Sequence, residues 1–143
     1  MRKQNGFSML EVLVTMMIVS FGLLGIAGII ANGLKANSSS YARSQASWFA
    51  NDIIDSMRAN RVTAELPAKP YDLLPTASAP SGTTVASTDL SNWRAALASA
   101  LPSGTGGVAV DTTTKKVTVI VQWDDSRAAG GVSTQQFTVE TRL

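Results

Sequence analysis

The sequence predicts an α+β chain: one long N-terminal helix spans a membrane and packs on a small antiparallel sheet, with one short extra helix. Three observations support this fold class. An uncharged apolar run extends from Val12 to Leu34, a helical apolar stripe continues to about residue 61, and alternating strand patterns occupy the C-terminal part. At 143 residues, the chain has room for one anchor and one modest soluble domain.

The apolar run is long enough to cross a bilayer, because about 20 consecutive apolar or small residues span the hydrocarbon core as a helix. We expect residues 7–33 to form the hydrophobic, membrane-spanning and assembly half of the long helix. Arg2 and Lys3 precede the run, so the positive-inside rule places the N-terminus in the cytoplasm and the later residues outside it. A secretory signal peptide is the alternative, but its apolar core is only about 7 to 15 residues long.

Glu11 lies within this apolar segment, where a plain membrane anchor would carry no charge. A charge at the centre of a membrane helix costs about 2.5–3.5 kcal/mol on insertion scales, and less near the interface. We therefore expect the Glu11 carboxylate to have a partner. The alternative is that its side chain simply reaches the lipid headgroups.

The segment from Lys3 to Leu13, Lys-Gln-Asn-Gly-Phe-Ser-Met-Leu-Glu-Val-Leu, resembles the leader and processing site of type IV pilin precursors. The resemblance implies that residues 1–6 are a cytoplasmic leader peptide, which a prepilin peptidase removes by cutting after Gly6. Phe7 would then become the N-terminus and be methylated, and Glu11 would be the family's glutamate. It also implies a pilin-like fold.

A cut after Gly6 would give Phe7 an α-amine, whose ordinary pKa of about 7.7–8.0 leaves much of it cationic near neutral pH. Phe7 and Glu11 are spaced i, i+4, so a pairing within one helix is possible. The family resemblance implies instead that Glu11 of one subunit meets the amine of a neighbour and sets the axial stagger in a filament.

Small residues recur every three positions along the anchor, at Gly22, Gly25, Gly28 and Ala31. Such a ridge lets another helix approach closely, so these residues are candidate helix-packing positions. The ordinary tolerance of membrane helices for glycine explains the same pattern.

The second half of the long helix, residues 34–61, is predicted to be amphipathic and to lie under a globular head. Leu34, Tyr41 and Trp48 are spaced by seven and form a second apolar line, for which core packing is favoured over a subunit contact. Arg58 and Arg61 in the last turn would complement the helix dipole, and Asn60 can end the helix. The apolar stripe comprises Ala42, Ala46, Phe49, Ala50, Ile53, Ile54 and Met57.

The residues from 62 to 143 are predicted to form the globular head. A loop rich in proline and small residues covers 62–87, and a short helix covers 88–101 with Thr88 or Asp89 as its cap. Antiparallel strands lie within 106–143 and are expected to number three or four. The predicted strands are Val108 to Asp111, Lys116 to Trp123, and Val132 to Leu143.

Composition excludes several function classes. The net charge of +2 indicates no nucleic-acid surface, and the chain contains neither histidine nor cysteine. We see no catalytic constellation, no cofactor site and no metal site, so no enzyme is predicted. Asp124 and Asp125 fit a turn; calcium coordination is the alternative and would need more oxygen ligands. Many pilins close their C-terminal region with a disulfide, and this chain departs from that pattern.

The residues Tyr41–Ala46 and Asp52–Arg61, above all Met-Arg-Ala-Asn-Arg, resemble minor pilins of the PilV kind. That resemblance implies a low-abundance subunit that primes assembly at the tip of the type IV pilus. It would start in the bacterial inner membrane, with its C-terminal domain in the periplasm, and move to the fibre at the cell surface. Motility by twitching and adhesion are the associated processes.

The implied partners are prepilin peptidase, other minor pilins, the major pilin and the inner-membrane assembly platform, with a tip adhesin as a further candidate. Three alternatives remain open at this point: a minor pseudopilin of a type II secretion system, a DNA-binding minor pilin for competence, and a membrane-anchored enzyme.

Overall fold

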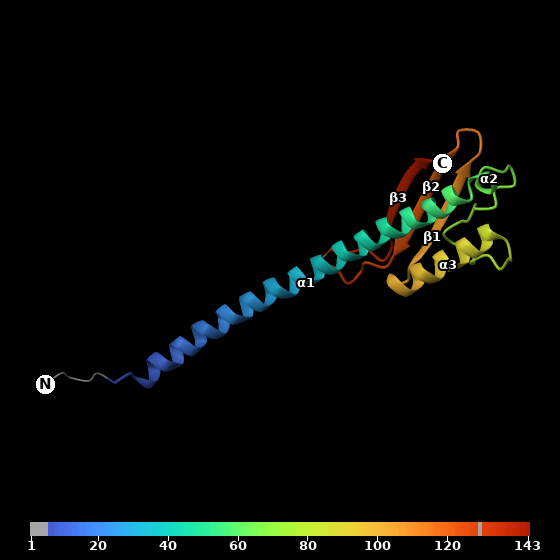
Figure 1. Cartoon of the computed structure of the whole chain (residues 1–143). Coiled ribbons are helices and arrows are strands. Elements are labelled where there is room, and N and C mark those ends of the chain that lie inside the picture. Colours follow the sequence, from blue (N-terminus) through green and yellow to red (C-terminus); the bar gives the residue numbers. More distant parts are fainter. Residues whose placement is uncertain (1–5, 129) are drawn as a thin grey trace.

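The fold is built on one long helix, α1, that carries a small head at its C-terminal end (Figure 1). The computed structural model describes residues 6–128 and 130–143. The elements are α1 (Met9–Ala59), α2 (Arg61–Ala64), α3 (Val85–Ala100), β1 (Thr105–Asp111), β2 (Lys116–Trp123) and β3 (Gln135–Arg142). The predicted α+β class, a long apolar helix on a small antiparallel sheet with a short helix, is confirmed.

Helix α1 contains 51 residues and is about 76 Å long at about 1.5 Å per residue. It begins two residues later than predicted, after Ser8, and ends at Ala59. Asn60 ends it, as predicted: its backbone leaves the helical region at φ −112° and ψ 39°, while its N–H still donates to the Ser56 carbonyl. Arg61 therefore belongs to α2 and not to the last turn of α1.

Only the C-terminal part of α1 is buried, and its buried residues are the predicted apolar stripe. The second apolar line is not part of the core. Leu34, Tyr41 and Trp48 are 65%, 65% and 63% exposed, so the prediction that they pack inside is wrong. Each residue turns the helix by about 100°, and Tyr41 and Trp48 consequently lie on the side of α1 away from the stripe at Ala46 and Phe49.

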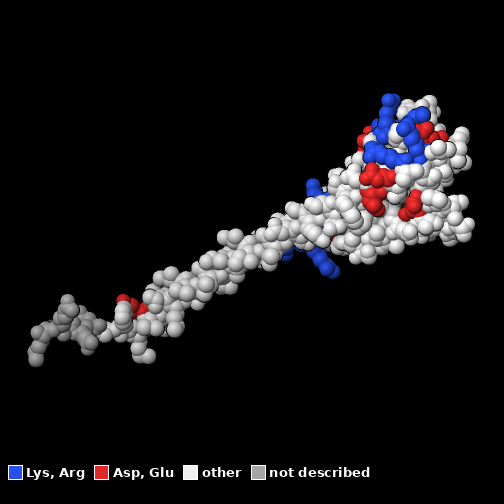
Figure 2. Space-filling view, in the orientation of Figure 1, with Lys and Arg blue, Asp and Glu red and all other residues white. Residues whose placement is uncertain are grey.

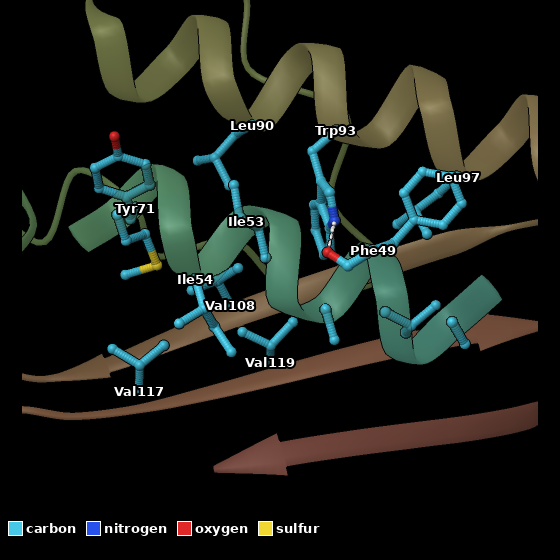
Figure 3. Close-up of a cluster of buried hydrophobic side chains, with 14 of the residues drawn as sticks. Phe49, Ile53, Ile54, Tyr71, Leu90, Trp93, Leu97, Val108, Val117 and Val119 are labelled. Atoms are coloured by element: carbon cyan, nitrogen blue, oxygen red, sulfur yellow. Dashed lines mark hydrogen bonds between the residues drawn. The ribbon is translucent and has the colours of Figure 1, made fainter. Parts of the chain in front are cut away.

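The sheet has the order β1-β2-β3 and is antiparallel throughout. In the central strand β2 the predicted inward row, Val117, Val119, Val121 and Trp123, is fully buried. Helix α1 lies between this row and α3, as Figure 3 shows. The indole of Trp93 on α3 donates a 2.9 Å hydrogen bond to the Phe49 carbonyl of α1, which ties the two helices together.

Helix α3 begins at Val85, three residues before the predicted start. Thr84 is its cap, because its hydroxyl accepts from the Ser87 N–H. The predicted caps Thr88 and Asp89 lie inside the helix. The carboxylate of Asp89 serves a different purpose, since it accepts a hydrogen bond from the hydroxyl of Tyr71.

The segment predicted as a surface loop at 62–87 takes part in the core. Its Tyr71 is completely buried. The Tyr71 hydroxyl donates to Asp89 at 2.5 Å and accepts from the Asn60 amide at 3.1 Å, so one side chain joins the end of α1 to α3. Further along, the guanidinium of Arg94 donates to the carbonyls of Leu74, Pro75 and Ala77.

Burial, and next the hydrogen bond to Asp89, raise the pKa of Tyr71 to about 12. The fold therefore favours the neutral phenol, and this stabilisation is complete below the unfolded-state pKa of about 10 and is lost as the pH rises towards 12. We expect the thermal unfolding temperature of the full chain in detergent to decrease as the pH is raised from about 10 to about 12. Tyr71→Phe should remove the part of this decrease that comes from Tyr71, whereas Tyr41→Phe, at an exposed position, should leave the decrease unchanged. Equal pH profiles for the wild type and Tyr71→Phe would contradict the assignment.

Candidate processing and assembly site

The predicted processing site lies at the N-terminal end of α1, and the head lies at the opposite end of this helix. Gly6 and Phe7 precede α1 in non-helical backbone, and Phe7 is 83% exposed. Ser8 has extended backbone, at φ −76° and ψ 149°, and is the N-cap. A peptide bond in exposed, non-helical backbone is accessible to a peptidase, so the position of Gly6 suits cleavage.

The N-cap binds the backbone of the predicted assembly residue. The Ser8 hydroxyl accepts a 3.2 Å hydrogen bond from the Glu11 N–H, which places Glu11 in the first turn of α1. A carboxylate there is favoured by the partial positive charge of the helix N-terminus. The role of Ser8 as a cap is not among the predictions made above from the sequence, although a serine three residues before a glutamate ahead of an apolar run is the signature of a capping box.

Phe7 and Glu11 do not share one helix in the uncut chain, because Phe7 lies outside the N-cap. The pairing of the two residues within one helix was predicted for the chain after cleavage at Gly6, and it stays a prediction. The remaining predicted leader residues, 1–5, lie outside the described residues.

No other described part of the chain covers the apolar half of α1. It is long and apolar enough to cross a membrane and is exposed throughout its most hydrophobic window. Added Cβ atoms at Gly22, Gly25 and Gly28 would meet nothing within 4 Å, and Ala31 is exposed, so the ridge is available to another helix. The packing role of these residues stays a prediction.

The hydroxyl groups within the apolar half are satisfied by the helix itself. Thr15 donates to the Val12 carbonyl at 2.8 Å and Ser20 donates to the Met16 carbonyl at 2.7 Å. Polar groups satisfied in this way are tolerated in lipid. From Gly6 to Leu34, Glu11 is the only charged residue, and Figure 2 shows acidic atoms at that end of an otherwise uncharged rod.

The acidic pair Asp124 and Asp125 forms a turn, as expected. The Asp124 carboxylate accepts from the Ser126 N–H at 2.9 Å, and this hydrogen bond lowers the pKa of Asp124. Asp125 accepts from the Ser39 hydroxyl of α1 at 2.7 Å, which fastens the turn to the helix. Within residues 6–128 and 130–143, no group of three or more acidic side chains is placed to hold a metal ion.

Residues 1–27 match the family model described as the prokaryotic N-terminal methylation motif. The chain carries a prepilin-type N-terminus. The matched residues include Gly6, Phe7, Glu11 and the first two glycines of the ridge, and they support a type IV pilin or pseudopilin class. No curated protein and no solved structure matches the chain.

The prepilin-type N-terminus implies processing by prepilin peptidase and a pilus-assembly context. The apolar helix behind it is consistent with a membrane-anchored pilin. The match ends before Gly28 and Ala31 and does not include the head. It therefore does not cover the segments that resemble minor pilins.

The Ser8 cap can be tested separately from processing. Ser8→Ala removes the acceptor for the Glu11 N–H, and loss of an N-cap costs about 1 kcal/mol. We expect hydrogen exchange of the first-turn amides of the full chain in detergent to accelerate by about fivefold. Ser20→Ala, which removes a hydroxyl within the helix, is the control. Equal exchange in wild type and Ser8→Ala would show that Ser8 does not cap α1.

Proposed function

We propose that the chain is a minor pilin of the type IV pilus, processed by prepilin peptidase after Gly6 and methylated on Phe7. The methylation motif at residues 1–27, at the N-terminal end of a capped apolar helix, is the observation that carries the processing and the pilin class. The assignment to the minor pilins rests on the resemblance of Tyr41–Ala46 and Asp52–Arg61. The long exposed rod supplies an assembly surface, and the head supplies the part specific to this subunit.

The charge pair proposed for assembly joins two subunits. Glu11 is the only charged residue between Gly6 and Leu34, so no charged side chain of the same apolar segment can pair with it. After cleavage, the amine of Phe7 in one subunit would pair with Glu11 of a neighbour. In the apolar interior of a fibre this pairing holds the axial register, because an unpaired charge there is expensive.

The head supports an interaction role without a polyanionic partner. Loss of Arg2 and Lys3 with the leader leaves ten basic and ten acidic side chains in residues 7–143. Several basic side chains of the head are already paired, including Arg61 and Lys115 with Glu65, and Figure 2 shows both signs of charge there. This balance favours assembly with other minor pilins, the major pilin and the inner-membrane platform at the fibre tip over DNA binding.

The proposal is tested by isolating the tagged protein from inner membranes and from sheared fibres of the cells that make it. We expect a mature chain beginning at N-methylated Phe7 in both fractions, together with pilus subunits in the sheared fraction. A chain that still begins at Met1 would overturn the processing. A correctly processed chain that co-purifies with secretion subunits and is absent from pili would assign it to a type II secretion pseudopilin.

A further inference from the structure

The two edges of the sheet are treated differently by the rest of the chain. Leu73 pairs with Val108 of β1 through two 2.8 Å backbone hydrogen bonds. Beside it, the Asp72 carboxylate accepts from the Val110 N–H at 2.6 Å. The β1 edge is thus closed by an extended segment of the same chain.

The β3 edge is open over eight residues. Strand β3 pairs with β2 on one side, and no described part of the chain pairs with its other side. Every second residue of an edge strand directs its N–H and C=O away from the sheet. Natural proteins protect such edges with charged side chains, proline, bulges or inward-pointing charges. Strand β3, Gln-Gln-Phe-Thr-Val-Glu-Thr-Arg, contains no proline, and its two charged residues, Glu140 and Arg142, are confined to its C-terminal end, so the edge from Gln135 to Val139 carries no charge.

The inner row of β3 is incompletely covered. Phe137, Val139 and Leu143 pack against the core but stay partly exposed, whereas the neighbouring row of β2 is fully buried. A further strand beside β3 would cover these side chains and satisfy the free backbone groups together. Addition of a strand to a sheet edge is a common mode of peptide recognition.

The charges at the end of β3 indicate which charged group an added strand should carry. Arg142 stands directly opposite Lys116 in the register, and like charges in that position repel. The Glu140 carboxylate forms a salt bridge with the Lys116 ammonium group, with 2.5 Å between Oε2 and Nζ. A carboxylate on an added strand beside Arg142 would offset the repulsion.

A second copy of the chain is a poor occupant. Its β1 edge is closed, so β3 of one copy cannot pair with β1 of another. Strand β3 runs in the same direction as α1 (Figure 1). Its first residue, Gln135, lines the same pocket as Arg43 of α1, and near its end the Thr141 hydroxyl accepts a hydrogen bond from Arg58 of α1. Antiparallel pairing of two β3 strands would therefore point two α1 helices in opposite directions, and both could not enter one bilayer. Parallel pairing in register would place Arg142 of one copy beside Arg142 of the other, where like charges repel.

We propose that the open β3 edge accepts an extended segment of a different polypeptide, with apolar residues at alternate positions and a carboxylate beside Arg142, as a fourth strand. The open edge belongs to the head, and only the exclusion of a second copy uses the membrane-spanning helix, so the proposal holds whether or not the chain is a pilus subunit.

Because the chain has no cysteine, single reactive sites can be introduced. Gln136→Cys and Thr138→Cys, both on the exposed face of β3, are labelled with benzophenone maleimide in the full chain in native membranes and illuminated. Ala109→Cys on the closed β1 edge is the matched control. We expect both β3 sites to form adducts with one stretch of one other polypeptide, at attachment points two residues apart. The Ala109 site should give roughly fivefold less adduct.

Charge reversal supplies the second measurement. Arg142→Glu should lower the yield of the Thr138 adduct by roughly threefold to tenfold, because it places like charges side by side. Arg127→Glu, in an exposed loop, should leave the yield unchanged. Adducts with a second copy, with scattered segments, or no more abundant than those from Ala109 would overturn the proposal.

Discussion

Glu11→Val is expected to abolish entry of the protein into fibres while leaving it processed and inserted in the membrane. The variant leaves the amine of a neighbouring Phe7 without its carboxylate in an apolar interior. Breaking a buried pair on one side costs about 3–5 kcal/mol, which corresponds to a loss of roughly a hundredfold or more in subunit uptake. The ratio of the protein in sheared fibres to that in inner membranes measures the effect.

Two further variants test whether a loss of uptake in Glu11→Val comes from the lost charge pair. Ser20→Val also replaces a polar residue in the apolar half of α1 with valine, and we expect it to keep normal uptake because the Ser20 hydroxyl bonds to the Met16 carbonyl of its own helix. Glu11→Asp keeps the charge on a shorter side chain and should recover part of the uptake. Normal uptake of Glu11→Val would refute the pairing.

The long helix and the central strand were predictable because each depends on a repeated local pattern. The apolar stripe of α1 and the alternation from Val117 to Trp123 each assign residues to one face of an element, and the structure buries those faces. Spacing alone does not state which face meets the core. Tyr41 and Trp48 keep the seven-residue spacing of a packed line, yet they lie on the exposed side of α1.

The role of the 62–87 segment was not predictable, because it depends on contacts between distant residues. Nothing near Tyr71 in the sequence indicates that its hydroxyl bonds to Asn60 and Asp89. The segment's prolines and small residues describe only its irregular backbone. The pairing of Leu73 with Val108 is equally non-local, and it decides which edge of the sheet stays open.

At the candidate site, a short motif carried most of the information. Gly6, Phe7 and Glu11 were identified by resemblance, and the methylation-motif match covers all three. The spacing of Ser8 to Glu11 is enough to predict the cap, but the extended backbone at Ser8 is known only from the structure. That backbone places Phe7 outside α1 in the uncut chain.

Trp93→Ala is expected to destabilise the head strongly. Trp93 is 2% exposed and lies between α1 and α3, and removal of a buried tryptophan costs about 3–5 kcal/mol. Small domains have only about 5–15 kcal/mol of stability, so this loss consumes a large share. Gly106 shows how tightly the ring is packed, since a Cβ there would lie 2.5 Å from Trp93 Cη2.

Hydrogen exchange of the β2 amides in the full chain in detergent measures this loss, because β2 is the centre of the sheet. Trp48→Ala is the matched control: Trp48 is 63% exposed, and we expect a change within about 0.5 kcal/mol. Trp93→Phe should fall between the two, because it keeps an aromatic ring but loses the donor to the Phe49 carbonyl, worth about 1 kcal/mol. That carbonyl lies within α1 and can still accept its helical hydrogen bond, so the expected cost of Trp93→Ala is dominated by the lost packing. Similar exchange rates in Trp93→Ala and Trp48→Ala would show that the α1–α3 contact does not hold the head together.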